Sequence, residues 1–100
     1  MKNTAVMILR IHYKDENDAE SREEDIDIEV PLHITANDLV TALNHGFQLG
    51  MDADNAPDAY LRTENPVTLV KGGKTVAEFG LYDGTVIHVT KRGGSSGEKV

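Results

Sequence analysis

The sequence predicts a single α+β domain in which one helix packs across a mixed sheet of about five strands. Near the start of the chain, apolar and polar residues alternate in two segments, as in half-buried strands. The apolar period then changes to that of a helix, and three short strand-like segments follow. A chain of 100 residues can build one hydrophobic core but not two.

The first two strands are expected at residues 5–13 and 26–32. In the first, Met7, Leu9 and Ile11 lie on the side assigned to the core. The second has the clearest alternation in the chain, with an apolar residue at each even position. The two strands are expected to form a hairpin. Because the second contains a proline, which cannot donate to a central ladder, it is predicted at the edge of the sheet.

Residues 14–25 carry most of the negative charge. The net charge of the chain is −7, and this segment holds seven acidic residues. It has no apolar period and its charges repel one another, so an acidic hairpin loop is expected there. Nucleic acid or an anionic membrane is disfavoured as the main partner, because such binders present clustered lysine and arginine.

A helix of about fourteen residues is predicted to begin at Thr35 and to stop at Gly50. Thr35 and Asp38 have the spacing of a capping box. The apolar face comprises Leu39, Val40, Leu43 and Phe47, and the opposite face comprises Asp38, Thr41, Asn44, His45 and Gln48. One amphipathic helix of this length covers one face of a small sheet.

Short strands are expected at residues 59–63 and 67–70, followed by a glycine-rich turn and a short helix that Gly80 ends. An Asp-Gly turn then leads into the last strand, 85–89. The domain is predicted to cover 1–90, and the glycine- and serine-rich segment 91–100 is expected to be a flexible tail. The residues expected in the core are Met7, Leu9, Ile11, Ile26, Ile28, Val30, Leu39, Leu43, Phe47, Leu61, Leu69, Phe79, Leu81, Ile87 and Val89.

This order of elements is that of a β-grasp domain, and residues 60–70 and 75–89 resemble the second half of ubiquitin-like proteins. The Glu-Phe-Gly-Leu pattern at 78–81, followed by a turn and a strand, is similar to that of the bacterial YukD/EsaB proteins. It also resembles the ubiquitin-like domain that begins the EccD membrane component of type VII secretion systems. The resemblance covers about residues 5–90 and implies a non-enzymatic, cytoplasmic accessory factor of that secretion apparatus. The acidic loop and the tail depart from the family pattern.

Strand alternation places several candidate binding residues on the sheet face opposite the helix. They are Ile8, Arg10, His12, Tyr60, Arg62 and His88, with Thr90 at the margin. In a β-grasp sheet the first and last strands are parallel neighbours, so the two histidines are expected to lie close together. Aromatic residues, arginine and aliphatic residues are favoured in interface cores, so this face is a candidate site for a protein partner. An ordinary solvated sheet face is the alternative.

The end of the chain suggests a second function. Arg92, Gly93 and Gly94 resemble the end of ubiquitin, where small glycines let a conjugating enzyme thread the terminus through a narrow channel. Six residues follow, as in a precursor that is processed after Gly94 and then conjugated to protein amines. The same composition also fits any flexible tail.

Catalytic, cofactor and metal sites are not expected. The chain has no cysteine, and its four histidines match no compact metal-ligand spacing. The turn at 71–74 lacks the strand-loop-helix setting of a phosphate-binding loop. No apolar run approaches the length of a membrane span, and the start lacks the pattern of a signal peptide. The sequence therefore predicts a cytoplasmic protein-binding module and not an enzyme.

Overall fold

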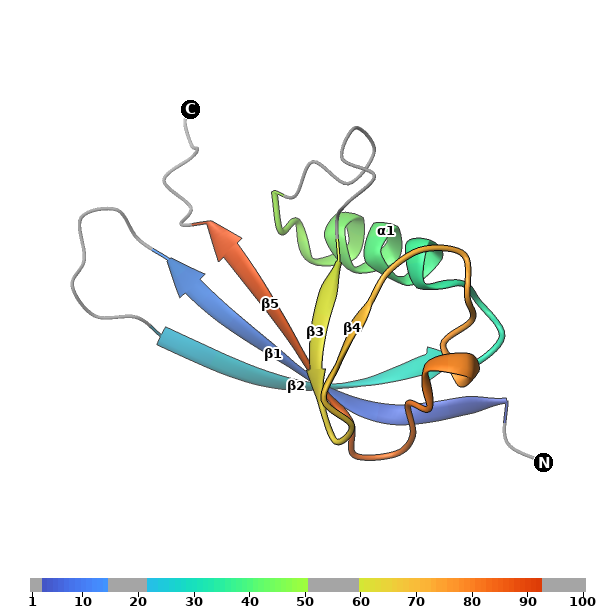
Figure 1. Ribbon diagram of the computed structural model, residues 1–100. Coiled ribbons are helices and arrows are strands. Elements are labelled where there is room, and N and C mark those ends of the chain that lie inside the picture. Colours follow the sequence, from blue (N-terminus) through green and yellow to red (C-terminus); the bar gives the residue numbers. More distant parts are fainter. Residues whose placement is uncertain (1–2, 15–21, 51–59, 93–100) are drawn as a thin grey trace.

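The computed structural model describes residues 3–14, 22–50 and 60–92, and the structural statements below refer to these residues (Figure 1). Their elements are β1 (Thr4–Lys14), β2 (Arg22–Pro31), α1 (Ala36–Phe47), β3 (Leu61–Glu64), β4 (Thr68–Val70), the 3₁₀ helix η1 (Ala77–Phe79) and β5 (Val86–Arg92). The strands form one five-stranded sheet in the order β2-β1-β5-β3-β4. β1 and β5 are parallel and the other pairs are antiparallel, so the predicted mixed sheet is confirmed.

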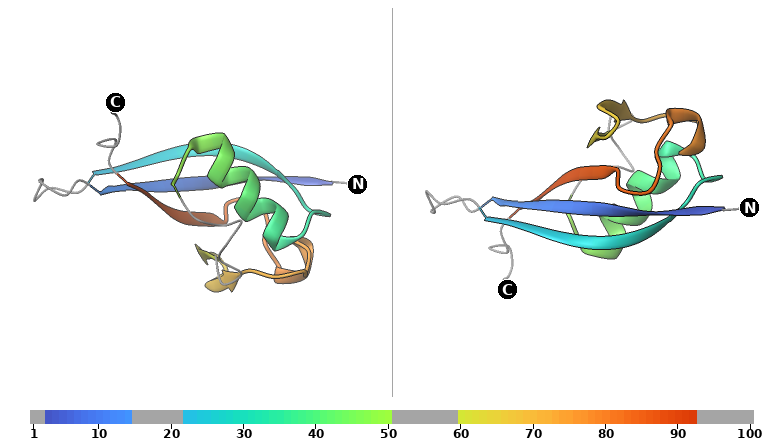
Figure 2. Two further views of the ribbon diagram at one scale, coloured as in Figure 1. Left: turned by 90° about the horizontal axis from the view of Figure 1, so that it is seen from above. Right: turned by 90° about the horizontal axis from the view of Figure 1, so that it is seen from below.

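Helix α1 covers one face of this sheet. It lies in front of the strands in one view of Figure 2 and behind them in the opposite view. The core between the two layers contains Met7 and Leu9 from β1, Leu39 from α1 and Ile87 from β5, all of them buried. Alternate residues of the central strands therefore point away from the helix, which leaves the second face of the sheet open.

The start of α1 follows the predicted capping box. Thr35 Oγ1 accepts a hydrogen bond from the Asp38 amide at 3.1 Å, and Asp38 Oδ2 accepts one from the Thr35 amide at 3.4 Å. The helix ends earlier than predicted, because Gln48 already has left-handed backbone angles and its amide bonds back to the Asn44 carbonyl. Asn44 was predicted on the exposed face but is buried.

The core differs from the prediction in two regions. Ile26, Ile28 and Phe47 were expected in the core but are only partly buried against it, and several residues in the last third of the chain are also placed differently. Leu69 was assigned to the core, but it is 51% exposed and its neighbour Val70 is buried instead. The reason is register, since Leu69 lies opposite Arg62 and therefore shares its side of the sheet. Phe79 is only partly buried and packs against the core, whereas Val76 is fully buried.

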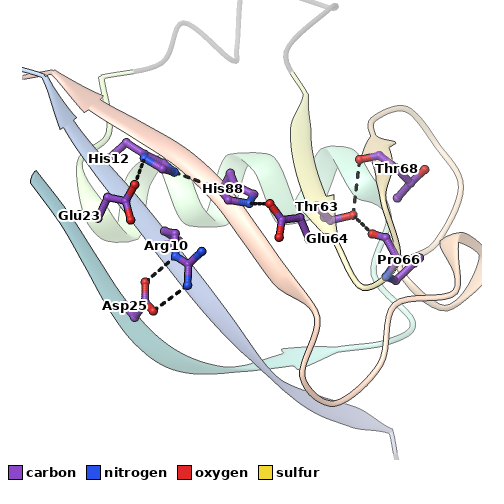
Figure 3. Close-up of polar contacts among 9 residues, drawn as sticks. All are labelled: Arg10, His12, Glu23, Asp25, Thr63, Glu64, Pro66, Thr68 and His88. Carbon is purple, nitrogen blue, oxygen red and sulfur yellow. Dashed lines mark hydrogen bonds and ion pairs between the residues drawn. The ribbon is translucent and has the colours of Figure 1, made fainter. Parts of the chain in front are cut away.

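The Thr63 side chain forms a hydrogen bond within the hairpin of β3 and β4. It is buried, and its hydroxyl donates a hydrogen bond to the Pro66 carbonyl at 2.6 Å (Figure 3). The Thr68 carbonyl lies 3.4 Å from the same hydroxyl. A buried hydroxyl with such a partner costs far less to bury than an unsatisfied one, so a polar residue is tolerated here.

Two segment boundaries also differ from the prediction. The acidic loop was expected over 14–25, but Lys14 belongs to β1 and Arg22–Asp25 belong to β2, since the ladder continues to the pair Tyr13–Arg22. The tail was expected from residue 91, but β5 continues through Arg92. The rest of both segments, 15–21 and 93–100, lies outside the described residues.

Candidate functional site

The open face carries a row of side chains that crosses all five strands. In strand order these are Asp25, Arg10, His88, Arg62 and Leu69, and each residue is the direct register partner of the next. Directly opposed residues project from the same side of a sheet. The residues on either side of Arg10 along β1 are buried in the core, so the row faces away from α1.

The structure places the predicted binding residues on this face. Arg10, Arg62 and His88 belong to the row, and Ile8 and His12 flank Arg10 along β1 on the same side. Tyr60 lies immediately before β3 and is 51% exposed. The sequence therefore grouped these residues correctly in space, and their role in binding stays a prediction.

Arg10 is held by an acidic partner from β2. Its Nε donates to Asp25 Oδ1 at 2.9 Å, and its Nη2 donates to Asp25 Oδ2 at 3.0 Å (Figure 3). The hydrogen bond from Arg10 lowers the pKa of the Asp25 carboxyl; desolvation opposes this shift, and the positive charge of Arg10 adds to it. This guanidinium already has a two-pronged carboxylate partner, so a new ligand would have to displace it.

Four side chains next to this pair form a continuous polar chain from β2 to β3. His12 Nδ1 lies 3.2 Å from Glu23 Oε2, and His12 Nε2 lies 3.0 Å from His88 Nδ1. At the other end, His88 Nε2 lies 2.9 Å from Glu64 Oε2. Figure 3 shows the two imidazoles between the two carboxylates. The chain thus joins β2, β1, β5 and β3.

The two histidines are shielded to different degrees. The side chain of His88 is 8% exposed and that of His12 is 30% exposed. Their ring centroids lie 5.2 Å apart with an angle of 21° between the ring planes. Because the expected proximity of His12 and His88 depends on the parallel pairing of β1 and β5, it is a consequence of topology.

The other half of the open face is mostly apolar and carries one arginine, which has no partner within residues 3–14, 22–50 and 60–92. We call it the β3–β4 surface, and it comprises Tyr60, Arg62, Val67 and Leu69. Val67 is 83% exposed, and Leu69 lies beside Arg62 in the register. Among the residues that the structure describes, Arg62 makes no hydrogen bond or ion pair. The two arginines of the row therefore differ, since Arg10 has a carboxylate partner and Arg62 has none in this part of the chain.

The sequence reasoning missed the acidic partners and the exposed leucine. Glu23 and Asp25 were assigned to a loop, and Glu64 to a turn. A signal was present for the first two, because acids at odd positions continue the alternation of the second strand back to residue 23. Leu69 belongs to a strand of three residues, which is too short to define its own period.

No arrangement for a metal or a membrane span is found in the described part of the chain. Within it, no group of three or more histidine, cysteine or acidic residues is placed to hold a metal ion. His33 is exposed between β2 and α1, and His45 is exposed on α1, so they do not join the other two histidines. Within the same residues, no helix has the length and hydropathy needed to cross a bilayer.

Comparison with known proteins identifies a matching protein family and solved structures with a similar fold. Residues 12–89 match the family model described as "WXG100 protein secretion system (Wss), protein YukD". No curated protein matches the chain. A de novo designed protein based on ubiquitin is similar in structure, with a TM-score of 0.55, 16% identity and 98% of each chain covered.

A natural protein shows the same likeness. The C-terminal ubiquitin-like domain of mouse tubulin-specific chaperone e matches with a TM-score of 0.50 and 16% identity, over 92% of this chain and 94% of that domain. At this identity the likeness shows the fold and nothing further. The fold is therefore the ubiquitin-like β-grasp, a five-stranded mixed sheet with one helix, as the sequence predicted.

Proposed function

Since this chain belongs to the YukD family of the WXG100, or type VII, protein secretion system, we propose that it is a cytoplasmic, non-enzymatic adaptor of that system. It acts by docking its open sheet face on a protein partner. The observation that supports this is the β3–β4 surface, where exposed Leu69 lies beside a guanidinium with no partner among the described residues, and exposed Val67 immediately precedes β4.

The two halves of the open face are unequal as binding surfaces. Binding through Arg10, His12 or His88 would have to disturb contacts that these side chains already make within the sheet. Removing a hydrogen-bonded partner from a shielded polar group is costly, so these residues are better suited to the margin of an interface. Within the described part of the chain, Arg62 and Leu69 make no such contact that binding would disturb. Buried aromatic residues and arginine supply much of the binding energy in interfaces. We therefore assign the centre of the interface to the β3–β4 surface.

The composition of this surface defines the partner's chemistry. Exposed aliphatic side chains favour an apolar patch on the partner, and the Arg62 guanidinium favours a carboxylate that can pair with it in two-pronged geometry. The partner segment should therefore present aspartate or glutamate beside aliphatic or aromatic residues. A component of the secretion system with such a segment is the proposed binding partner.

Complementation in native cells tests the adaptor function. Cells that lack the gene receive the wild-type protein, Arg62→Glu or the matched control Arg22→Glu, and WXG100 protein in the culture medium is measured. Arg22 lies on β2 and stacks on the Tyr13 ring at 4.7 Å, so the control makes the same charge change away from the β3–β4 surface. We expect Arg62→Glu to reduce export at least about tenfold, as for a central interface residue, and Arg22→Glu to support normal export. Equal export with both variants would contradict the proposal.

Crosslinking identifies the partner in the same cells. A photo-crosslinking amino acid at position 69 should form an adduct with a secretion-system component, and one at position 33 should not. His33 is exposed and lies outside the β3–β4 surface, so it controls for random contacts. Adducts of the same composition from both positions would contradict docking through this surface.

The modifier function suggested by Arg92, Gly93 and Gly94 is the second candidate. Its basis is the sequence alone, and β5 continues through Arg92, so the two glycines follow the strand without a spacer. Intact-mass analysis of protein taken from cells under denaturing conditions distinguishes the two functions. Chains that end at Gly94, with a ladder of larger adducts, would establish the modifier. Deletion of residues 93–100 would then abolish function, whereas the adaptor should tolerate it.

A further inference from the structure

Strand β2 forms one edge of the sheet, and within residues 3–14, 22–50 and 60–92 no strand pairs with its outer side. Its register with β1 runs over ten consecutive positions without a bulge. The opposite edge, β4, has only three residues. A long and regular edge presents a row of backbone hydrogen-bonding groups to which another strand can bind.

Two hydrogen bonds show which backbone groups of β2 point outward. The Leu32 amide donates to the Asn3 carbonyl at 2.8 Å, at the position directly after the last register pair of β1 and β2. On β1, the Ile8 amide donates to the Thr85 carbonyl at 2.9 Å, although Ile8 lies opposite Asp27 of β2. Residues that exchange hydrogen bonds across an antiparallel pair alternate with residues that do not. The even-numbered residues of β2 therefore bond to β1, and the N–H and C=O groups of the odd-numbered residues point away from it.

The outward backbone groups belong to a row of acidic residues. The odd-numbered residues of β2 are Glu23, Asp25, Asp27, Glu29 and Pro31. Because proline has no N–H, the row of donors ends before Pro31. The four acidic residues thus present four N–H and four C=O groups to another strand. We call residues 23–29 the β2 edge.

The side chains of the β2 edge differ between the two faces of the sheet. On the open face, the four carboxylates face one guanidinium in the described part of β1, that of Arg10. Asp27 lies opposite Ile8 and makes no hydrogen bond or ion pair among the described residues. On the helix side, Ile26 and Ile28 are half-buried and pack against the core. The edge is therefore acidic on one side and aliphatic on the other.

We propose that the β2 edge binds an extended segment of a partner protein in which basic and apolar residues alternate. The segment adds to the sheet as a further strand and bonds to the outward N–H and C=O groups. Since successive side chains of a strand point to opposite faces, its lysines and arginines lie against the acidic row and its apolar residues cover Ile26 and Ile28. Backbone hydrogen bonds supply affinity, and the alternating side chains supply specificity.

A second copy of this chain fits the β2 edge poorly. If two β2 strands paired through their outer sides, acidic residues of one copy would lie opposite acidic residues of the other, and like charges directly opposite one another are destabilising. Charged edge strands prevent such pairing between copies. The same row of carboxylates attracts a strand with lysine or arginine at alternate positions, so the charge selects a basic partner.

This inference goes beyond the proposed function, because it concerns a second surface. The β2 edge and the β3–β4 surface lie at opposite ends of the strand order. Neither requires the other, and the two differ in chemistry, since the β3–β4 surface favours an acidic partner segment and the β2 edge a basic one. A failed test of the β2 edge leaves the adaptor function standing.

Amide hydrogen exchange of the full chain, followed by nuclear magnetic resonance, tests the β2 edge. The probe is a synthetic peptide of about eight residues in which lysine and valine alternate, a typical length for a strand. At about 1 mM peptide we expect the amides of residues 23, 25, 27 and 29 to exchange at least about threefold more slowly, since bound peptide protects them in proportion to occupancy. The amides of residues 24, 26 and 28 already bond to β1 and should change less. A peptide of the same composition with its lysines in one block is the control for charge alone. Equal protection by both peptides, or no protection of the odd-numbered amides, would overturn the proposal.

Two substitutions at one position separate the backbone from the charge. Asp27→Asn removes the charge and keeps the outward N–H, whereas Asp27→Pro removes both, and proline is tolerated on edge strands where the N–H faces outward. We expect Asp27→Pro to bind the alternating peptide at least about tenfold more weakly than Asp27→Asn in a fluorescence titration. Leu69→Ala, on the β3–β4 surface, should bind it like the wild type. Equal affinity of the two Asp27 variants would refute strand addition, and hydrogen exchange of the wild type decides the question if Asp27→Pro fails to fold.

Discussion

Arg10 and Asp25 face each other across β1 and β2 through two parallel hydrogen bonds, although 15 residues separate them in the chain. The pair lies in register within the ladder and holds acidic β2 against β1 on the open face. A two-pronged guanidinium–carboxylate contact fixes geometry as well as charge. Part of the negative segment of the sequence is therefore a structural element of the sheet.

This pair predicts a specific dependence of stability on pH. Arg10 lowers the pKa of Asp25 in the folded protein, so Asp25 contributes stability above its unfolded pKa and loses it as the pH falls through the folded value. We expect Asp25→Asn to lower the free energy of unfolding near about pH 7 and to have a smaller effect near about pH 3, below the ordinary pKa of an aspartate, because protonation begins to remove the contribution of the charged carboxyl there. Urea unfolding at both pH values measures this. Asp27→Asn is the control, because Asp27 lies two register positions away, opposite Ile8. Equal destabilisation by Asp25→Asn at both pH values would contradict the prediction.

Leu9 and Leu69 test the assignment of the two sheet faces with one chemical change. Leu9 is completely buried, so Leu9→Ala should reduce the free energy of unfolding by about 2–5 kcal/mol. Leu69 is 51% exposed on the open face, so Leu69→Ala should change it by no more than about 0.5 kcal/mol. Thermal or urea denaturation compares the two. A large loss for Leu69→Ala would return that residue to the core and remove it from the β3–β4 surface.

Thr85 predicts the cost of losing a buried hydroxyl. It is fully buried, its Oγ1 donates to the Asn65 carbonyl at 2.6 Å, and it accepts from the Tyr82 amide at 3.0 Å. Thr85→Val keeps the shape but leaves both backbone groups without this partner, so we expect a loss of about 1–3 kcal/mol in the free energy of unfolding. Thr90→Val is the control, because Thr90 is exposed on β5. A loss for Thr85→Val no larger than for the control would show that these hydrogen bonds add no stability.

Elements with a long local period were predicted well. The alternation in β1 and β2 and the apolar face of α1 repeat over enough residues for sequence alone to identify each element and its buried side. The capping box at Thr35 and the left-handed position at Gly80 were also visible, because each depends on residue types only a few positions apart.

The site was predicted only in part. Alternation placed Arg10, Arg62 and His88 on one face, but it could not show that Arg10 is paired and that Arg62 is free of such a partner in the described residues. That difference depends on which acid lies opposite each arginine. Cross-strand register decides which residue that is, and register is a property of two paired strands and not of either strand alone.

The sequence by itself determined the order of the elements, the inward side of the long ones and the membership of a β-grasp fold, because each follows from a local period or a short motif. Tertiary structure decided how far β2 and β5 extend, that Val70 and not Leu69 enters the core, and that His12 meets His88 between two carboxylates. These features depend on strand pairing between segments far apart in the chain. In a strand of three residues or a charged strand end, the local sequence pattern is too short to predict which residues it will pair with. The register of the neighbouring strands determines that pairing.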